Sequence, residues 1–182
     1  MLELTPSSLN NVALVKSEVE SLERIGTNKT QIGRVESYYV AKTDQNILAQ
    51  IDTAHIYDGH INNNNNAVGF HREASGINEK GQINAKVTAY TFPPNDVGVY
   101  TGRIEVNGIA KTSNQGQSTF VPKDWSVART NYEITEAFKA GQALQPTNNT
   151  AFNAVSPSGV QFRFVPPTSG GSVSKWRGWP IR

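Results

Sequence analysis

The spacing of apolar residues changes at about residue 54, and this change limits the possible folds more than any other feature of the chain. Across residues 8–26, apolar positions recur at three- and four-residue intervals, as they do on one buried face of a helix. Ser7 or Ser8 would cap this helix, and Gly26 would end it. A less regular pattern of the same kind predicts a second helix over residues 30–51.

Beyond that point the pattern favours β-strands. Segments rich in β-branched and aromatic residues alternate in polarity, and Pro93-Pro94 and the hairpin signal Asn107-Gly108 end two of them. The connection from His55 to His71 is rich in Gly and Asn, which predicts irregular structure there. The predicted strands are residues 86–92, 97–106, 160–165 and 173–176.

One more helix is predicted among these strands, at residues 124–141, with Asp124 or Ser126 as its cap. The fold class is therefore α+β, with N-terminal helices followed by mostly antiparallel sheets and an inserted helix. We expect residues 1–53 to form a helical subdomain and residues 54–182 a second region. The inserted helix offers five candidate core residues, which are Val127, Tyr132, Ile134, Ala137 and Phe138.

Several classes of protein lose support from what the chain lacks. No window approaches the roughly 18 consecutive apolar residues of a membrane-spanning helix, so no membrane partner is expected. The N-terminus has no signal-peptide pattern, which favours a cytoplasmic protein or one delivered by another route. Cysteine is absent, which excludes disulfides, thiolate zinc sites and cysteine nucleophiles. A phosphate loop and a G-x-S-x-G elbow are also missing.

The charge distribution favours a phosphate-bearing partner at the C-terminal end. The net charge of +2 is too small to indicate nucleic acid by itself. No acidic residue follows Glu136, however, so the last part of the chain is basic. A solvated basic surface is the alternative interpretation. The basic residues in this part are Lys139, Arg163, Lys175, Arg177 and Arg182.

The three histidines of the chain, His55, His60 and His71, lie close together in the sequence. Two imidazoles can act as a base and an acid at the same pH, because histidine titrates near neutrality. Cleavage of RNA by its own 2′-hydroxyl needs such a pair, together with a cation that stabilises charge on phosphorus. A zinc-dependent hydrolase using all three histidines is the competing interpretation. Their spacing matches no compact zinc motif, and H-E-x-x-H is absent.

The residues around these histidines resemble the EndoU endoribonucleases. H-I-Y-D-G-H at residues 55–60 and A-V-G-F-H at residues 67–71 are similar to the paired-histidine signature of that family. The family has a lysine some forty residues after the second histidine, and here Lys111 follows His71 by 40 positions. S-T-F-V-P-K-D-W-S at residues 118–126 resembles the "FFPxxW" stretch of bacterial members, and G-V-Q-F at residues 159–162 resembles a strand near their end.

The resemblance implies an EndoU-like catalytic region at residues 54–182 and a metal-independent transesterification. It gives His71 as the general base, His55 as the general acid and Lys111 as the group that stabilises the transition state; which histidine is acid and which is base stays open. The products would be a 2′,3′-cyclic phosphate and a free 5′-hydroxyl. We expect no cofactor. Some members respond to manganese, but no carboxylate cluster that would hold the ion is evident in the sequence.

Near the C-terminus the chain departs from the family pattern. Many members have a Ser or Thr and then a Tyr before Pro, and these residues bind uracil. Here Trp179 replaces that tyrosine, and stacking on an indole tolerates any base, so a uridine preference is not implied. The indole could instead plug the edge of the core. Further residues expected to bind substrate are Ser172 or Ser174 as the hydroxyl donor, Lys175 and Arg177 at the rim, and His60 as a loop residue near phosphate.

The expected partner is RNA, either tRNA or single-stranded RNA. Bacterial domains of this type are often toxins that an immunity protein neutralises, so the chain is expected to be a free-standing nuclease or a toxin domain delivered into target cells. A binding module without catalysis, for RNA or protein, is the remaining alternative. The complete set of His55, His71 and Lys111 argues against that alternative.

Overall fold

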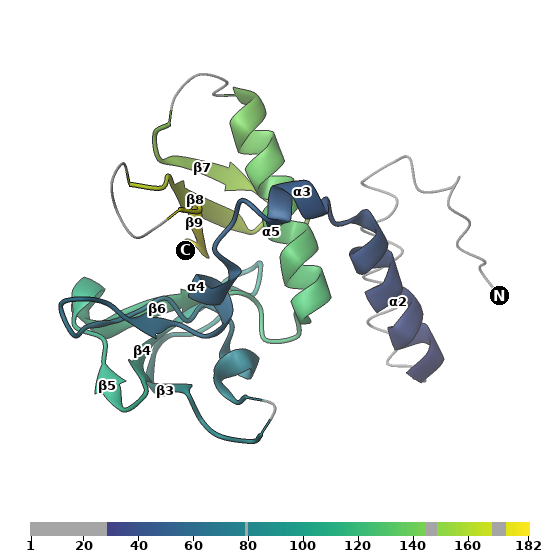
Figure 1. Cartoon of the computed structure of the whole chain (residues 1–182). Coiled ribbons are helices and arrows are strands. Elements are labelled where there is room, and N and C mark those ends of the chain that lie inside the picture. The colour runs from purple at the N-terminus through teal and green to yellow at the C-terminus, as the bar shows by residue number, and fades with distance from the viewer. Residues whose placement is uncertain (1–28, 79, 145–148, 169–173) are drawn as a thin grey trace.

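The computed structural model describes residues 29–78, 80–144, 149–168 and 174–182 of the chain (Figure 1). The helix predicted over residues 8–26 lies outside the described residues. Helices come first, two antiparallel sheets follow, and a long helix is inserted between them, which confirms the predicted α+β class. None of the described helices is long and apolar enough to cross a membrane.

The first described part of the chain is helical but broken. The single helix predicted over residues 30–51 is wrong, because Asp44 is extended and its carboxylate accepts the N–H groups of Asn46 and Ile47. Ile51 leaves the helical path altogether and forms a β-bridge with Trp176. The helices here are α2 (Lys29–Lys42), α3 (Gln45–Leu48) and α4 (Thr53–Tyr57).

The connection between His55 and His71 is more regular than its composition predicts. After α4, which carries His55, the chain forms a small hairpin of β1 (His60–Ile61) and β2 (Ala67–Val68). The asparagine run makes its turn, since Asn62 accepts two backbone N–H groups through its side chain. The prediction of irregular structure, with His60 in a loop, was therefore wrong.

A four-stranded antiparallel sheet forms the lower part of the molecule in Figure 1. Strand β4 is central, with β3 on one edge and β5 and β6 sharing the other. Asn107 and Gly108 both have positive φ and connect β4 to β5, which confirms the predicted turn. The strands are β3 (Ala85–Phe92), β4 (Tyr100–Val106), β5 (Ile109–Ala110) and β6 (Gln117–Phe120).

Two short single-turn segments flank this sheet. Segment η2 (Glu73–Gly76) precedes β3, and segment η3 (Ser113–Gly116) precedes β6. The interior of the lower sheet packs Tyr100, Phe120 and Phe70 together, so the residue before His71 is part of its core. This packing fixes the chain on both sides of β2 against β4 and β6.

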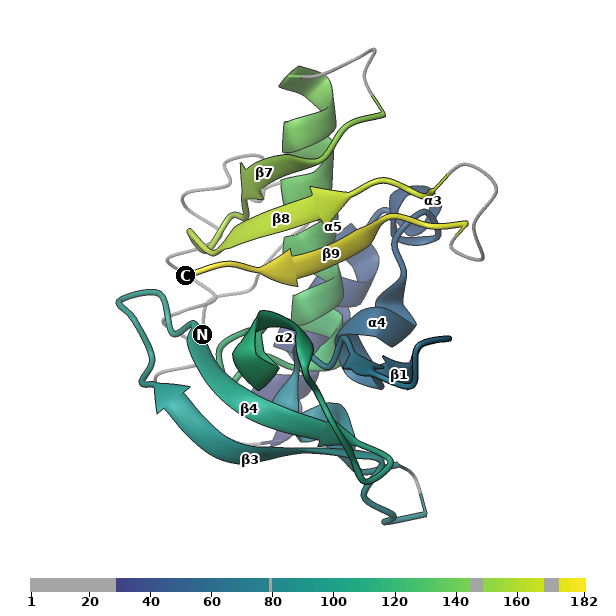
Figure 2. The same cartoon turned by 90° about the vertical axis from the view of Figure 1, so that its left-hand side faces the viewer.

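The second sheet has three strands and packs against α5 (Val127–Leu144), as Figure 2 shows. The predicted strand at 160–165 is confirmed as β8. The strand predicted at 173–176 is wrong in its bounds: Ser174 and Lys175 precede the strand, Trp176 pairs with Ile51, and the strand begins at Arg177. The strands are β7 (Phe152–Val155), β8 (Gln161–Val165) and β9 (Arg177–Pro180).

Helix α5 lies close to its predicted position, and Ser126 is the residue that caps it. The Ser126 hydroxyl accepts the Arg129 N–H at 3.0 Å. Val127 was wrongly predicted to face the core and is 46% exposed, because it lies in the first turn, ahead of the turns that pack on the sheet. The four other candidate core residues, Tyr132, Ile134, Ala137 and Phe138, are buried as predicted.

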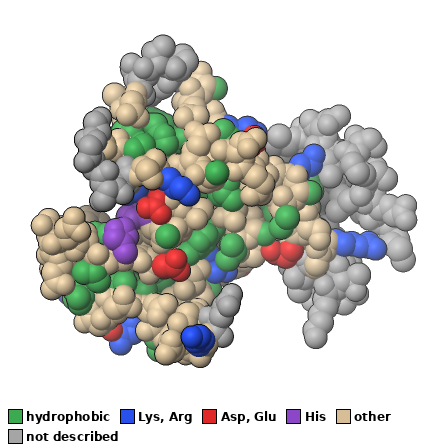
Figure 3. Space-filling view, viewed as in Figure 1, with side chains coloured by type: hydrophobic (Ala, Val, Ile, Leu, Met, Phe, Trp, Pro, Cys, Tyr) green, Lys and Arg blue, Asp and Glu red, His purple; other side chains and the backbone are tan. Residues whose placement is uncertain are grey.

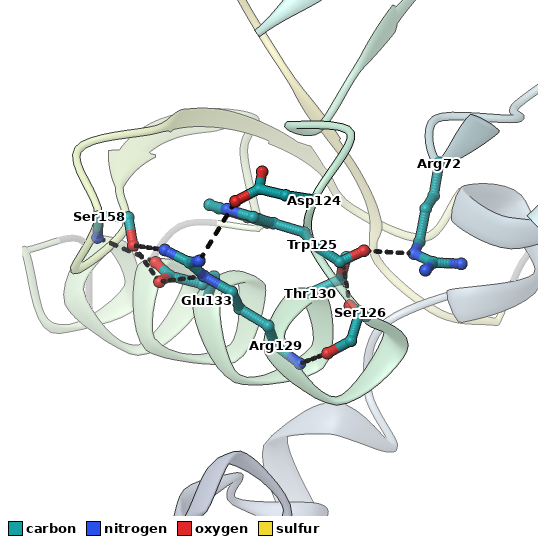
Figure 4. Close-up of polar contacts among 8 residues, drawn as sticks. All are labelled: Arg72, Asp124, Trp125, Ser126, Arg129, Thr130, Glu133 and Ser158. Carbon is teal, nitrogen blue, oxygen red and sulfur yellow. Dashed lines mark hydrogen bonds and ion pairs between the residues drawn. The ribbon is translucent and has the colours of Figure 1, made fainter. Parts of the chain in front are cut away.

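A buried ion pair within α5 is hydrogen-bonded to Ser158 in the turn between β7 and β8 (Figure 4). Glu133 is only 2% exposed, and its carboxylate lies 3.8 Å from the Arg129 side chain. The same carboxylate accepts the backbone N–H and the hydroxyl of Ser158, and Arg129 donates to that hydroxyl as well. Because buried charges need partners, this network fixes the upper sheet against the helix.

Candidate active site

The site lies where α4 and β9 meet the lower sheet (Figures 1 and 2). His55 is on α4, whose start is capped by Asp52: its carboxylate accepts the His55 N–H at 3.2 Å. The carbonyl of His55 accepts the N–H of Phe70 at 2.8 Å, and the carbonyl of Ile56 accepts the N–H of His71 at 2.7 Å. Backbone hydrogen bonds therefore hold the two histidine segments side by side.

Gly69 makes this close approach possible. Gly69 and Phe70 both have positive φ, so the chain turns sharply just before His71. A Cβ atom on Gly69 would lie 2.4 Å from the carbonyl oxygen of His55 and 3.0 Å from its Nδ1. Only glycine satisfies both the conformation and the space at this position.

The two imidazole rings face each other across a short gap. Their centroids are 5.2 Å apart, and the side chains are almost buried, at 6% exposure for His55 and 4% for His71. Nδ1 of His71 lies 2.7 Å from the carbonyl oxygen of Thr119. Since a carbonyl only accepts, Nδ1 carries the hydrogen, and Nε2 of neutral His71 keeps a lone pair that can take up a proton.

Both rings are held in the neutral form at neutral pH. Burial lowers the pKa of His71 from its ordinary 6.5 to about 3, and the nearby Lys111 cation adds to this effect. Burial also lowers the pKa of His55 well below its ordinary value, and the electrostatic interactions with His71, His60, Arg177 and Lys111 add to this effect. Nδ1 of His55 has no hydrogen-bond partner among the described residues.

Lys111 reaches the site from the segment that follows β5. Its Nζ donates to the Ser118 hydroxyl at 3.0 Å, and that hydroxyl donates to the carbonyl of Gly69 at 2.9 Å. Lys111 is thereby connected, through one serine, to the turn that positions His71. Burial lowers the pKa of the Lys111 ammonium to about 8, so that it is charged at neutral pH but not under alkaline conditions.

Trp179 places an aromatic face beside both histidines. Its ring lies 6.3 Å from that of His71 at an interplanar angle of 18°, and 6.1 Å from that of His55 at 56°. Arg177, two residues earlier on β9, is half-buried and contributes to the lowered pKa of His55. The structure thus brings the C-terminal strand to the histidine pair, as the sequence predicts for Trp179 and Arg177.

The remaining predicted substrate-binding residues are spread more widely. His60 begins β1 with an exposed side chain, and its ring centroid is 5.9 Å from that of His55. Ser174 is exposed ahead of β9, and Ser172 lies outside the described residues. Lys175 lines a separate cavity of about 220 Å³, shared with Tyr57 and Asn131. No contact with the histidine pair is seen for Lys175.

Sequence reasoning missed Ser118 and Thr119 as parts of the site. Both lie in the stretch that precedes α5, on the edge of β6 that faces the Gly69 turn. The residues of β6, Q-S-T-F, do not alternate in polarity, and nothing in the sequence indicates that Thr119 meets a histidine 48 residues away. Arg72 further anchors this region, since it donates to the carbonyl of Trp125 at 2.9 Å (Figure 4).

The site combines two neutral imidazoles with an ammonium group, and it is suited to proton transfer beside an anion. Figure 3 shows histidine side chains at the surface where the two sheets meet. No group of three or more His, Cys, Asp or Glu side chains within the described residues is arranged to hold a metal ion. The three histidines therefore do not converge on one point as zinc ligands would.

Comparison with known proteins identifies the family of the chain. The model of the bacterial EndoU nuclease family matches residues 49–177, which is well over half of the chain. The chain belongs to the bacterial EndoU nuclease family. His55, His71 and Lys111 all lie within the matched range.

A curated relative extends the comparison to a named protein. A Bacillus cereus protein named "Toxin" is 43% identical to this chain over 84 residues. The matched part makes up 46% of this chain but only 15% of that protein, so the chain spans a small part of the length of its relative. No solved structure matches the chain.

Proposed function

We propose that this chain is an endoribonuclease that cleaves RNA by metal-independent transesterification. Nε2 of His71 accepts the proton of the 2′-hydroxyl, whose oxygen attacks the adjacent phosphorus. His55 donates a proton to the departing 5′-oxygen, and Lys111 stabilises the negative charge on the phosphoryl oxygens. The pair of buried rings with centroids 5.2 Å apart carries this proposal, since two imidazoles this close together could both act on one bound phosphate.

The substrate itself helps to charge the general acid. In the free protein, burial and neighbouring cations lower the pKa of His55, so the ring is neutral. A bound phosphate brings a negative charge between His55 and Lys111, and a nearby anion favours the protonated imidazole. His71 keeps its hydrogen bond to Thr119 and remains the base. The two rings thus take up different roles only when the substrate is bound.

Trp179 supports a stacking site for a base next to the cleaved phosphate. Its ring lies beside both histidines, and an indole face accepts any base. Arg177 on the same strand supplies positive charge for the backbone. We therefore propose an RNA substrate with single-stranded character at the cut and little selection for uridine.

The test uses RNA oligonucleotides that differ from one another by a single 2′-hydroxyl. Purified protein with excess EDTA is expected to cut the all-ribose oligonucleotide and to spare the phosphate that follows a single 2′-deoxy position. Cleavage next to the deoxy position would contradict attack by the 2′-oxygen. Activity that disappears in EDTA and returns with zinc would favour the zinc-dependent hydrolase instead.

The relative named "Toxin" supports a further step of the proposal, that the nuclease acts as a bacterial toxin inside a target cell. Induced expression of the wild-type chain in a bacterial host is expected to arrest growth and degrade RNA, and expression of His71→Ala is expected to do neither. An immunity protein that neutralises the toxin is the proposed partner, and blocking the face around His55 and Trp179 would suffice. Equal growth with both forms would contradict the toxin role.

A further inference from the structure

A second aromatic and cationic pair lies on the lower sheet, away from the histidines. Phe92 ends β3 with a side chain that is 53% exposed. The guanidinium of Arg182 lies over this ring, 5.1 Å from its centroid. Pro93 and Pro94 follow directly and stop the strand there. The pair presents a flat apolar face next to a positive charge.

The strand register connects this pair to the histidine site. Phe92 pairs with Thr101 of β4, and Thr101 pairs with Thr119 of β6, whose carbonyl binds the His71 ring. Phe92, Thr101 and Thr119 therefore form one row across the sheet, and this row ends at the His71 ring. Two strand spacings separate Phe92 from Thr119, or about 10 Å.

The C-terminal segment spans the same interval. Arg182 follows Trp179 by three residues, which reach at most about 11 Å. Ile181 donates its N–H to the carbonyl of Gln161 at 2.8 Å and so fixes the path of the segment. Figure 2 shows the end of β9 directed toward the end of β3. We call the surface between Trp179 and Arg182 the track. Its Trp179 end lies at the histidine pair, and its Arg182 end lies at Phe92.

The floor between the two ends is polar. The hydroxyl groups of Thr91 and Thr101 are hydrogen-bonded at 2.7 Å, and Thr91 also donates to Gln117 at 3.0 Å. Thr91, Gln117 and Thr119 are half-buried rather than covered completely. No acidic side chain belongs to this row, so nothing in it repels a phosphodiester backbone.

We propose that Phe92 and Arg182 form a second nucleotide-binding site, which holds the single-stranded RNA that flanks the cleaved phosphate. A base stacks on the Phe92 ring or on the guanidinium plane of Arg182, and Arg182 neutralises a backbone phosphate. This site rests on the proposed ribonuclease function, because its ligand is the flanking part of the same strand. It makes the enzyme prefer substrates that extend beyond the two nucleotides at the cut.

The sheet offers a matched control for the ring. Tyr90 is 57% exposed and lies two residues earlier on β3, but it pairs with Gly102, the neighbour of Thr101. Adjacent positions of β4 face opposite sides of the sheet, so Tyr90 lies on the face away from this track. It contacts Glu73 and Lys123 there. Tyr90→Leu therefore removes an equally exposed ring without touching the proposed site.

The experiment compares kcat/KM on a dinucleotide with kcat/KM on a longer single-stranded oligoribonucleotide that contains the same cut site. Phe92→Leu and Arg182→Gln are expected to lower the value for the long substrate about tenfold, as for the loss of one stacked base, and to leave the dinucleotide unchanged. Phe92→Trp should restore the preference for length, and Tyr90→Leu should keep it. Unchanged values, or equal losses on both substrates, would overturn the proposal.

Salt dependence supplies a second readout that a folding defect does not produce. In a His55→Ala background that binds without cutting, Arg182→Gln is expected to reduce the slope of log affinity against log salt by about 0.7, for one phosphate contact to a single strand. Lys86→Gln, which removes an exposed lysine at the other end of β3, should leave the slope unchanged. An unaltered slope for Arg182→Gln contradicts the phosphate contact. Failure of the wild type to cut even the dinucleotide would instead refute the proposed function itself.

Discussion

The ring of Trp179 lies nearly parallel to that of His71, with centroids 6.3 Å apart and planes inclined by 18°. The tryptophan therefore helps to shield the imidazole from water, and this burial is the main cause of the low pKa of His71. Trp179, which is proposed to stack on a nucleotide base, thus also helps to lower the pKa of His71, the proposed general base. In the proposed mechanism, this one aromatic contact would couple substrate binding to proton transfer.

Replacing Trp179 with alanine is expected to raise the pKa of His71 toward 6.5, because water then reaches the ring. The acid limb of the pH profile of kcat/KM should move to higher pH, and KM should rise because a stacking surface is lost. Trp179→Tyr keeps most of the ring and should shift the limb less. Steady-state kinetics from pH 4 to 8 test this, and an acid limb that stays in place in Trp179→Ala would contradict the shielding role.

The titration of Lys111 leads us to expect a fall in rate at alkaline pH. Its pKa of about 8 means that the ammonium loses its charge as the pH rises through that value, so the rate should fall above it. Lys111→Met should lose about 10²–10³-fold in kcat at neutral pH, as for removal of one charge-stabilising donor. Lys111→Arg should retain part of the activity and should lack the fall in rate centred near pH 8. The same alkaline fall in Lys111→Arg would assign that limb to another group.

The buried histidines make the folded state sensitive to acid. Because the folded pKa of His71 is about 3 and its ordinary value is 6.5, the unfolded chain binds more protons between these values. Stability is therefore constant above about pH 6.5 and falls below it, by about 2 kcal/mol from His71 at pH 5. Lowered pKa values at both histidines act in the same direction. Urea unfolding at pH 7 and 5 should show a smaller loss for His71→Gln than for the wild type; equal losses would contradict this assignment.

Gly69 provides a steric test of the site. Gly69→Ala should reduce kcat about 10²-fold, since the added Cβ atom would lie 2.4 Å from the His55 carbonyl and would displace the turn before His71. Gly81 has nearly the same positive φ, but nothing lies within 4 Å of a Cβ built there. Gly81→Ala should therefore cost stability by strain alone and keep full activity. Full activity in Gly69→Ala would show that the spacing of the two histidines is not critical.

Periodicity predicted the parts of the fold that local residues determine. The inserted helix, β3 and β4 were predicted from periodicity, and the turn from the residues Asn107-Gly108. Lys111 was singled out only through the resemblance to the EndoU family. The two wrong boundaries have different causes. At Asp44 a side chain caps a new helix and interrupts the predicted one. At Trp176 the backbone pairs with Ile51, which is distant in the sequence. The Ser118 link between Lys111 and Gly69 was beyond prediction, because it depends on where three distant segments meet.

The proposed roles of His71 as the base and His55 as the acid differ in whether they depend on the leaving group. The measurement compares kcat/KM for a ribonucleoside 3′-(4-nitrophenyl phosphate), whose leaving group needs no proton, with that for a ribodinucleotide. His55→Ala is expected to lose about 10²–10⁴-fold on the dinucleotide and little on the nitrophenyl ester, whereas His71→Ala should lose heavily on both. If His71→Ala keeps its activity on the nitrophenyl ester and His55→Ala does not, the two roles are reversed. Equal losses by both variants on both substrates would contradict the assignment of one base and one acid.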